Sequence, residues 1–225
     1  MIQKISDNYN HFAASSDQIV KERAKKLFEG ALKSHNWEHT LRVYKLCGRI
    51  GVAKGADMDV LLNAAYLHDI GRCSQEASNG AVCHAEKGAE MARSIIQDLP
   101  LSDMQKENII HCVRSHRFRG NHTPRTAEAK ILFDADKLDS IGAVGVARAF
   151  LFAGEVGARL HNPDIDVEDA RPYSKDDTGF REFKVKLTKI KDRILTKEGQ
   201  EMARERHDFM EEFFKRFLEE YDGKR

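Results

Sequence analysis

Apolar residues recur along most of the chain at the three- and four-residue spacing of amphipathic helices, and no sustained alternation typical of strands is present. This pattern predicts helices over about residues 18–33, from Asn36 onward, over 58–70 and over 84–99. Residues 58–70 are nearly all apolar, so we expect this helix to be buried on most sides, with Gly71 ending it. The predicted fold class is all-α.

The helical pattern continues beyond residue 100 with two interruptions. Ser102 and Gln105 have the spacing of a capping box and are expected to open a helix that runs through Val113. A basic loop with glycine and proline follows, and the helical pattern returns near Ile131. Residues 155–178 are rich in Asp, Pro and Gly without a period, which predicts a long loop of the kind that often serves as a lid or binding segment.

The length of 225 residues suits a single domain, and no segment has the composition of a linker. We therefore expect one compact helical bundle over 1–225, with a core over about 20–155. The loop of 155–178 and the C-terminal helices over about 180–221 are expected to complete it, with these helices packed on the core. The buried face of the last helix is predicted to consist of Met202, Phe209, Phe213 and Phe217.

The composition is typical of a folded protein in a reducing compartment. Lys+Arg (37) and Asp+Glu (36) nearly balance, so the net charge gives no general attraction to nucleic acid or to an anionic membrane. No run approaches the ~20 apolar residues that span a bilayer, and the first residues lack the apolar run of a signal peptide. We expect a cytoplasmic protein without a membrane or nucleic-acid partner, and a homo-oligomer remains open.

Candidate metal ligands lie in apolar surroundings at His39, His68, Asp69 and Asp136. Burying a carboxylate is costly unless it is paired or bound to a cation, so these residues require a partner. A single buried histidine is usually a satisfied core residue, but here all four candidates occur in predicted apolar helices. Mixed imidazole and carboxylate ligands suit Zn, Mn, Fe, Co or Ni better than Ca.

The succession of a His, a His-Asp pair and a distal Asp resembles the HD-domain superfamily of metal-dependent phosphohydrolases. The similarity extends over about residues 20–220 and is greatest to small stand-alone bacterial members, through DADKLDSIGAVGVAR (134–148) and LTKIKDRILTKEGQEMARERHDFMEEF (187–213). The resemblance implies a single HD-domain bundle that binds one or two divalent ions, from among Mn, Ni, Co, Zn, Fe and Mg. It assigns the ligands to His39, His68, Asp69 and, by aligning ADKL, to Asp136.

Two further histidines extend the resemblance. His84 and His116 fall where two-metal members of the superfamily place the ligands of a second ion, with Asp69 as the bridge. The alternative is that both orient water or contact phosphate, and the sequence leaves the two interpretations open. His111 is expected to be structural.

Several basic residues are candidates for binding phosphate. Arg72 follows HDIG directly, where related members often carry Lys, and its other interpretation is a solvated cation at a helix end. Arg148 lies within an apolar helix and requires an anion, either an internal carboxylate (Asp139 or Glu128) or a substrate phosphate. The remaining basic candidates are Arg114, Arg117, Arg119, Arg125 and Lys137.

The expected activity is metal-dependent hydrolysis of a small phosphorylated substrate, as a phosphomonoesterase, a phosphodiesterase or a nucleotide pyrophosphohydrolase. A metal-activated water would attack phosphorus near Asp69, with His116 or His84 managing protons and Arg72 neutralising phosphate charge. The resemblance implies a nucleotide substrate. The alternatives are a di-iron HD-fold oxygenase, which the same six ligands would satisfy, and a non-catalytic module that binds metal or nucleotide.

Overall fold

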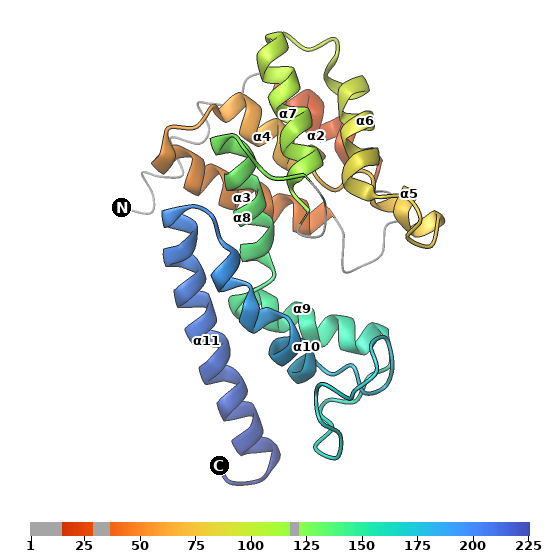
Figure 1. The fold of residues 1–225 in the computed structure, drawn as a ribbon, viewed down its shortest axis with the longest axis vertical. Coiled ribbons are helices and arrows are strands. Elements are labelled where there is room, and N and C mark those ends of the chain that lie inside the picture. The colour runs from red at the N-terminus through yellow and green to blue at the C-terminus, as the bar shows by residue number, and fades with distance from the viewer. Residues whose placement is uncertain (1–14, 29–36, 118–121) are drawn as a thin grey trace. The chain divides into compact units, whose positions relative to one another are not determined.

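The computed structural model describes residues 15–28, 37–117 and 122–225, and within these ranges it contains helices, turns and no strand. The all-α prediction is confirmed. No helix in these ranges is long and apolar enough to cross a membrane. The chain divides into two compact units, one ending at Asp136 and the other beginning at Lys137 (Figure 1).

The first unit is built around α4, which packs against α2, α3 and α7, while α6 lies along α7 and contacts the short helix α5. Its interior is aliphatic, and Leu61, Leu67, Ile109 and Ile131 are among its fully buried side chains. The helices of this unit are α2 (Ser15–Lys26), α3 (Trp37–Lys54), α4 (Met58–Leu67), α5 (Arg72–Ala77), α6 (His84–Ile96), α7 (Asp103–Ser115) and α8 (Ala127–Asp139), the last of which continues into the second unit.

Helix starts in the first unit are fixed by their caps. The capping box predicted at Ser102 and Gln105 is confirmed, with both reciprocal hydrogen bonds present. Asp57 caps α4 by accepting from the backbone N–H of Val60, and its other carboxylate oxygen accepts from the Gln105 side chain at 3.0 Å. Glu128 accepts from the backbone N–H of Asp57, so the starts of α4, α7 and α8 are tied together.

The prediction that Gly71 ends the helix of residues 58–70 is wrong. Helix α4 ends at Leu67, and Gly71 is instead the N-cap of α5, with φ −83°. A Cβ atom at this position would lie 2.2 Å from the backbone oxygen of His84 and 2.7 Å from the backbone nitrogen of Gly88. The glycine is therefore required by the close approach of α6. The predicted first helix likewise ends earlier, at Lys26, and Asn36 lies outside the described residues.

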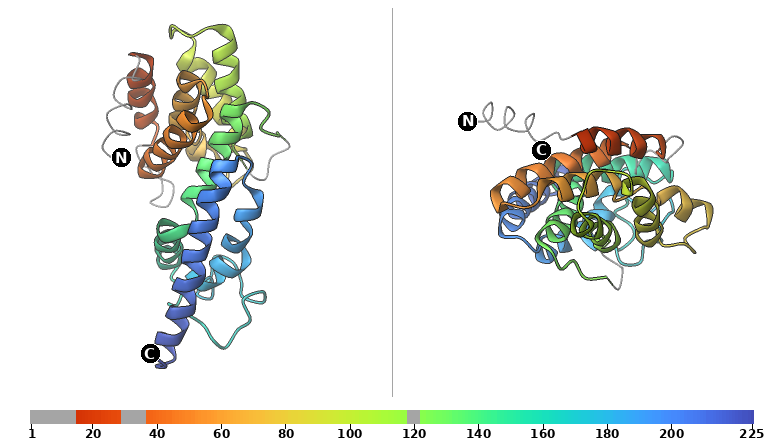
Figure 2. Two further views of the ribbon diagram at one scale, coloured as in Figure 1. Left: turned by 90° about the vertical axis from the view of Figure 1, so that its left-hand side faces the viewer. Right: turned by 90° about the horizontal axis from the view of Figure 1, so that it is seen from above.

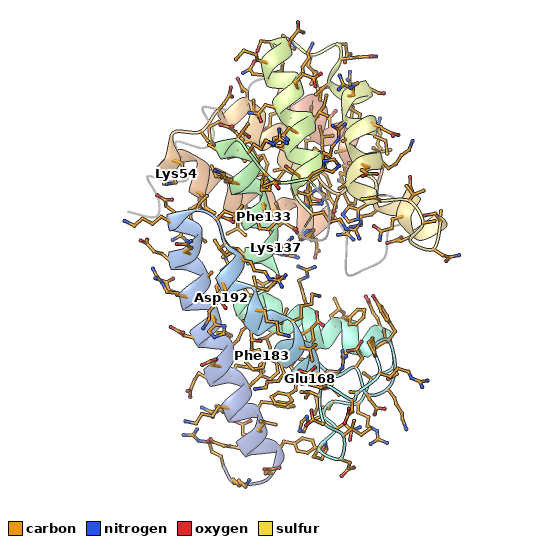
Figure 3. The ribbon with its side chains drawn as sticks, viewed as in Figure 1. Lys54, Phe133, Lys137, Glu168, Phe183 and Asp192 are labelled. Atoms are coloured by element: carbon orange, nitrogen blue, oxygen red, sulfur yellow. The ribbon has the colours of Figure 1, made fainter. Side chains whose placement is uncertain are left out.

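The second unit is built around α9 (Gly142–Glu155), which packs against α10 (Gly179–Val185) and α11 (Lys197–Tyr221), with two short 3₁₀ turns at Leu187–Lys189 and Lys191–Arg193. Figure 2 shows α11 as one long, unbroken helix. Phe183 of α10, labelled in Figure 3, stacks on Phe214 of α11 with ring centroids 4.4 Å apart. How residues 180–221 pack on the predicted core remains a prediction.

The predicted buried face of α11 is partly wrong. Met202 is buried, but Phe209 is 46% exposed and Phe213 and Phe217 are half-buried. The buried residues of α11 are Gly199, Met202, Ala203, His207, Met210 and Phe214. Three phenylalanines at four-residue spacing suggested the face, yet Met210 and Phe214, each one position after a predicted phenylalanine, are buried instead.

Residues 156–178 form no helix, as predicted for a long loop. The segment is folded back on itself: the backbone N–H of Arg159 donates to the carbonyl of Lys175 at 2.8 Å. Asn162 donates to the Asp176 carboxylate at 2.7 Å, and Arg181 of α10 forms an ion pair with Asp177. A role as a lid remains a prediction.

Candidate metal centre

Three of the predicted ligands converge in the first unit. His39 lies on the buried stripe of α3, His68 follows the last residue of α4, and Asp136 is on α8. Their ligand atoms all lie within 4.8 Å of one another. The Nε2 atoms of the two histidines are 3.3 Å apart, and His39 Nε2 is 3.3 Å from Asp136 Oδ1. We call His39, His68 and Asp136 the first triad.

A second group of ligand atoms, equally tight, is formed by Asp69, His84 and His116. His84 is the first residue of α6, and His116 follows the last residue of α7. Their Nε2 atoms are 3.3 Å apart, and each lies 3.4 Å from Asp69 Oδ1. We call these residues the second triad. The structure thus brings together all six residues that the sequence singled out as ligands.

Asp69 lies between the two triads. Its Oδ1 is directed at the second triad, while its Oδ2 is 3.8 Å from His39 Nε2 and 3.7 Å from His68 Nε2 of the first. The side chain is 1% exposed, and Oδ2 has no hydrogen-bond partner among the described residues. A buried carboxylate oxygen without a partner is costly, and a cation beside it would remove that cost. One carboxylate can therefore serve ions at both triads.

The imidazoles are oriented by their other ring nitrogen. His68 Nδ1 donates to the Ala65 carbonyl at 2.8 Å, and His116 Nδ1 donates to the Val113 carbonyl at 2.6 Å. His84 Nδ1 contacts the side-chain oxygen of Gln75. Since these oxygens can only accept, each Nδ1 carries the hydrogen and each Nε2 presents a lone pair to the centre.

The protonation states suit a metal site. Burial lowers the pKa of His68 to about 4 and the pKa of His84 to about 2, so both rings are neutral near pH 7. Burial alone would raise the pKa of the Asp69 carboxyl, but His68 and the Arg72 guanidinium outweigh it and hold this pKa well below its usual range. Neutral imidazoles around an ionised carboxylate are the ligand forms that divalent metals bind.

The described residues therefore fit one or two divalent ions. The donor set comprises four imidazoles and two carboxylates, of which only Asp136 has a side chain more than marginally exposed, at 16%. Such nitrogen and oxygen donors suit borderline transition metals.

Arg72 is adjacent to the metal centre. Its Nε donates to Asp69 Oδ1 at 3.0 Å, and its side chain is 22% exposed. Its two terminal nitrogens have no hydrogen-bond partner among the described residues. The interpretation as a solvated cation at a helix end is therefore incomplete, because Arg72 also donates to the Asp69 carboxylate that lies between the two triads.

The other basic residues that the sequence proposed as phosphate contacts have different surroundings. Arg117 donates to the Sγ of Cys83, directly before His84, at 3.2 Å. Arg148 pairs with Asp139 in the second unit at 2.8 Å, which selects the internal carboxylate among the anions that the sequence left open. Lys137, labelled in Figure 3, follows Asp136 on α8, and its contact with substrate remains a prediction. The contacts predicted for Arg114 and Arg125 also remain predictions, and Arg119 lies outside the described residues.

His111 and Gln75 each contact a neighbouring residue of interest for the site. His111 accepts from the backbone N–H of Arg125 at 3.0 Å, in agreement with the structural role expected for it. Gln75, which contacts His84, was missed by the sequence reasoning. No periodicity or motif marks a glutamine that acts through a neighbour, and the only available signal was its place three residues after Arg72.

Comparisons with known proteins agree with this geometry. A family model described as the HD domain matches residues 36–141. The chain is 32% identical to YpgQ of Bacillus subtilis over 197 residues, which cover 84% of this chain and 85% of YpgQ. It is also 30% identical to ribonuclease Y of Mycoplasma mycoides subsp. mycoides over 126 residues, which cover 56% of this chain and 22% of that enzyme.

Solved structures extend the likeness to nearly the whole chain. The crystal structure of Bacillus subtilis YpgQ in complex with ADP has a TM-score of 0.69 at 27% identity, covering 92% of this chain and 94% of that one. An HD-superfamily hydrolase from Bacillus thuringiensis has a TM-score of 0.73 at 25% identity, covering 92% and 97%. A predicted HD-superfamily hydrolase from an uncultured Thermotogales bacterium has a TM-score of 0.64 at 28% identity, covering 92% and 91%.

Proposed function

The chain belongs to the HD-domain superfamily, and on that premise we propose that it is a metal-dependent phosphohydrolase whose substrate is a nucleotide. The observation that carries the proposal is the place of Asp69, whose two oxygens lie between two triads of buried ligands. Two adjacent divalent sites bridged by one carboxylate suit in-line displacement at phosphorus.

The residues of the chain have separate tasks in this proposal. A divalent ion bound here would lower the pKa of a coordinated water toward about 7 and neutralise phosphate charge. Asp69, held ionised, orients the attacking water and fixes the spacing of the two triads. His84 and His116 are oriented by their Nδ1 contacts, so that each directs its Nε2 atom at the centre.

Arg72 is the residue we assign to the substrate. Its Nε is occupied by Asp69, while its terminal nitrogens have no partner in the part of the chain that the structure describes, on a side chain that is 22% exposed. A planar guanidinium can donate two parallel hydrogen bonds to a phosphate, and it would stabilise the charge that develops during attack. Arg117, which donates to the Sγ of Cys83 directly before His84, is a further candidate for phosphate.

A nucleotide is favoured as substrate by one of the relatives that match along nearly their whole length. YpgQ has been crystallised with ADP, and the likeness covers 94% of that chain. We propose that this chain also binds a nucleoside di- or triphosphate and cleaves a phosphoanhydride bond. Release of pyrophosphate would identify a nucleotide pyrophosphohydrolase, and release of phosphate alone would identify a phosphatase.

The test is hydrolysis by purified protein that has been stripped with a chelator and supplied with one divalent ion at a time. We expect ion-dependent release of phosphate or pyrophosphate from a panel of nucleoside mono-, di- and triphosphates. Asp69→Asn should abolish it, while Asp208→Asn, an exposed aspartate of α11, should leave it unchanged. Bis-p-nitrophenyl phosphate tests the phosphodiesterase alternative.

A second candidate is supported by the same six ligands, which would also satisfy a di-iron oxygenase. Iron bound stoichiometrically, with dioxygen consumption and no release of phosphate or pyrophosphate, would replace the hydrolase. Ions that bind without any turnover would favour a non-catalytic binding module.

A further inference from the structure

The three imidazoles with assigned tautomers are not oriented in the same way. His68 and His116 lie at the ends of α4 and α7, and each donates to a backbone carbonyl three residues earlier in its own helix. His84 is the first residue of α6, so the position three residues earlier is outside the helix and supplies no such carbonyl. Its Nδ1 instead contacts the side chain of Gln75.

Gln75 belongs to α5, a six-residue helix in which no residue is buried. Arg72, one turn earlier on the same helix, donates to Asp69 Oδ1, the oxygen that lies 3.4 Å from both histidines of the second triad. Helix α5 therefore supplies outer contacts to two of the three residues in that triad. In the first triad, by contrast, the outer contact of His68 comes from the backbone of α4 itself.

The position of α5 is fixed at both ends. At its start, Gly71 allows the backbone to approach α6 more closely than any side chain would permit. At its end, the carbonyl of Gln75 accepts from the N–H of Gly80 at 2.8 Å, within a turn where Asn79 and Gly80 have positive φ. The backbone of Gln75 is thus fixed at a place from which its side chain contacts His84.

We propose that Gln75 is a positioning residue for His84, and that through it α5 sets the metal affinity of the second triad independently of the first. The inference rests on the two-ion site of the proposed function. An amide oxygen fixes the ring and its tautomer without adding a negative charge beside Asp69. Loss of this acceptor would leave His84 free to rotate, while His39, His68 and Asp136 keep their contacts.

The experiment is a calorimetric titration of metal-free protein with Mn²⁺, in the absence of substrate. The wild type should bind two ions. Gln75→Leu should weaken one of the two binding events by about 10- to 100-fold and leave the other unchanged. Gln75→Glu, which retains an acceptor oxygen, should restore the weakened event, whereas a purely structural role would give no such rescue. Ser74→Ala, on the same helix, is the matched control and should bind as the wild type does.

A double-mutant comparison assigns the weakened event to the second triad. In a His84→Gln background, Gln75→Leu should have no further effect, because the residue that it positions is already removed. The inference is overturned if the wild type binds fewer than two ions, if Gln75→Leu weakens both events equally or neither, or if its effect persists without His84. A protein that binds two ions with this pattern but hydrolyses no nucleotide overturns the proposed function alone.

Discussion

The Nε2 atoms of His84 and His116 face each other at 3.3 Å, and with their hydrogens on Nδ1 neither donates to the other. Each ring has its hydrogen on Nδ1, where His84 meets Gln75 and His116 meets the Val113 carbonyl. Two lone pairs directed at each other across a buried gap repel, and only a positive charge between them makes the arrangement favourable. This pair is therefore the clearest local sign of a cation in the second triad.

Asp69→Asn should remove the stabilisation that metal gives to the fold. Ligand that binds only the folded state stabilises it by about 2.7 kcal/mol per site at 100 times the dissociation constant. Because Asp69 lies between both triads, the substitution should abolish most of the rise in Tm produced by Mn²⁺ in the wild type. Thermal unfolding with and without the ion measures this. An undiminished rise in the variant would exclude Asp69 as a bridge.

The metal-free protein should lose stability as the pH falls from about 6.5 toward 4. The pKa of His68 is lowered by burial to about 4 in the fold, against about 6.5 when unfolded, so the unfolded chain binds more protons in this window. Each such proton costs about 1.4 kcal/mol per pH unit. Denaturant unfolding at about pH 7, 6 and 5 should show the decline.

The matched variants for this pH dependence are two histidine substitutions. His68→Gln should make the decline shallower without abolishing it, because it removes one of two buried groups that the unfolded state protonates and leaves His84 in place. His122→Gln, at an exposed position, should leave the slope unchanged. A slope in His68→Gln as steep as that of the wild type would assign the titration to other groups.

Gly71→Ala should separate α5 from α6. The added methyl group would lie 2.2 Å from the His84 carbonyl oxygen, while φ of −83° poses no obstacle, so the effect is one of packing. We expect a loss of about 1–3 kcal/mol in the free energy of unfolding, with weaker metal binding. Gly154→Ala, where no atom lies within 4 Å of the new methyl group, should cost nothing. Equal Tm values for the two variants would contradict the close approach.

Arg148→Ala should destabilise the second unit and leave the KM for nucleotide unchanged. The guanidinium pairs with Asp139, whose side chain is 2% exposed, and removing one member of a buried pair costs up to about 3–5 kcal/mol. Arg216→Ala, which breaks an exposed pair with Glu220, should have no measurable effect on Tm. A raised KM with an unaltered Tm would instead restore the substrate contact that the sequence left open for Arg148.

Local signals in the sequence predicted those features that depend on nearby residues. The capping box at Ser102 and Gln105 is satisfied within one turn, so it could be read from four residues. The role of Gly71 could not be predicted from nearby residues, because it is determined by the backbone of α6. This backbone lies beyond a turn and approaches Gly71 closely only in the fold. The buried face of α11 was also misplaced because it depends on contacts that form only in the fold. Phe209 matches the helical period, but Met210 is the residue that packs in the core.

The residues of the candidate site also divide into those that the sequence predicted and those that it could not predict. Residue types and their apolar surroundings singled out His39, His68, Asp69 and Asp136, and the resemblance to a family added His84 and His116 as candidates. The sequence could not decide whether His84 and His116 join Asp69, because that depends on where α6 begins and α7 ends in space. Gln75 could not be predicted from the sequence, because a residue that acts through a hydrogen bond to a ligand has no characteristic spacing of its own.

Helices α4 and α7 have their starts tied together through Asp57 and Gln105, and both end at a ligand, His68 and His116. Each helix therefore directs the negative end of its dipole toward the same buried space, in addition to the charge of Asp69. Without bound ions, the negative electrostatic potential of the centre repels an anionic phosphate and attracts cations. Binding should accordingly be ordered, with ions entering first and reversing the local potential before a phosphorylated substrate can approach.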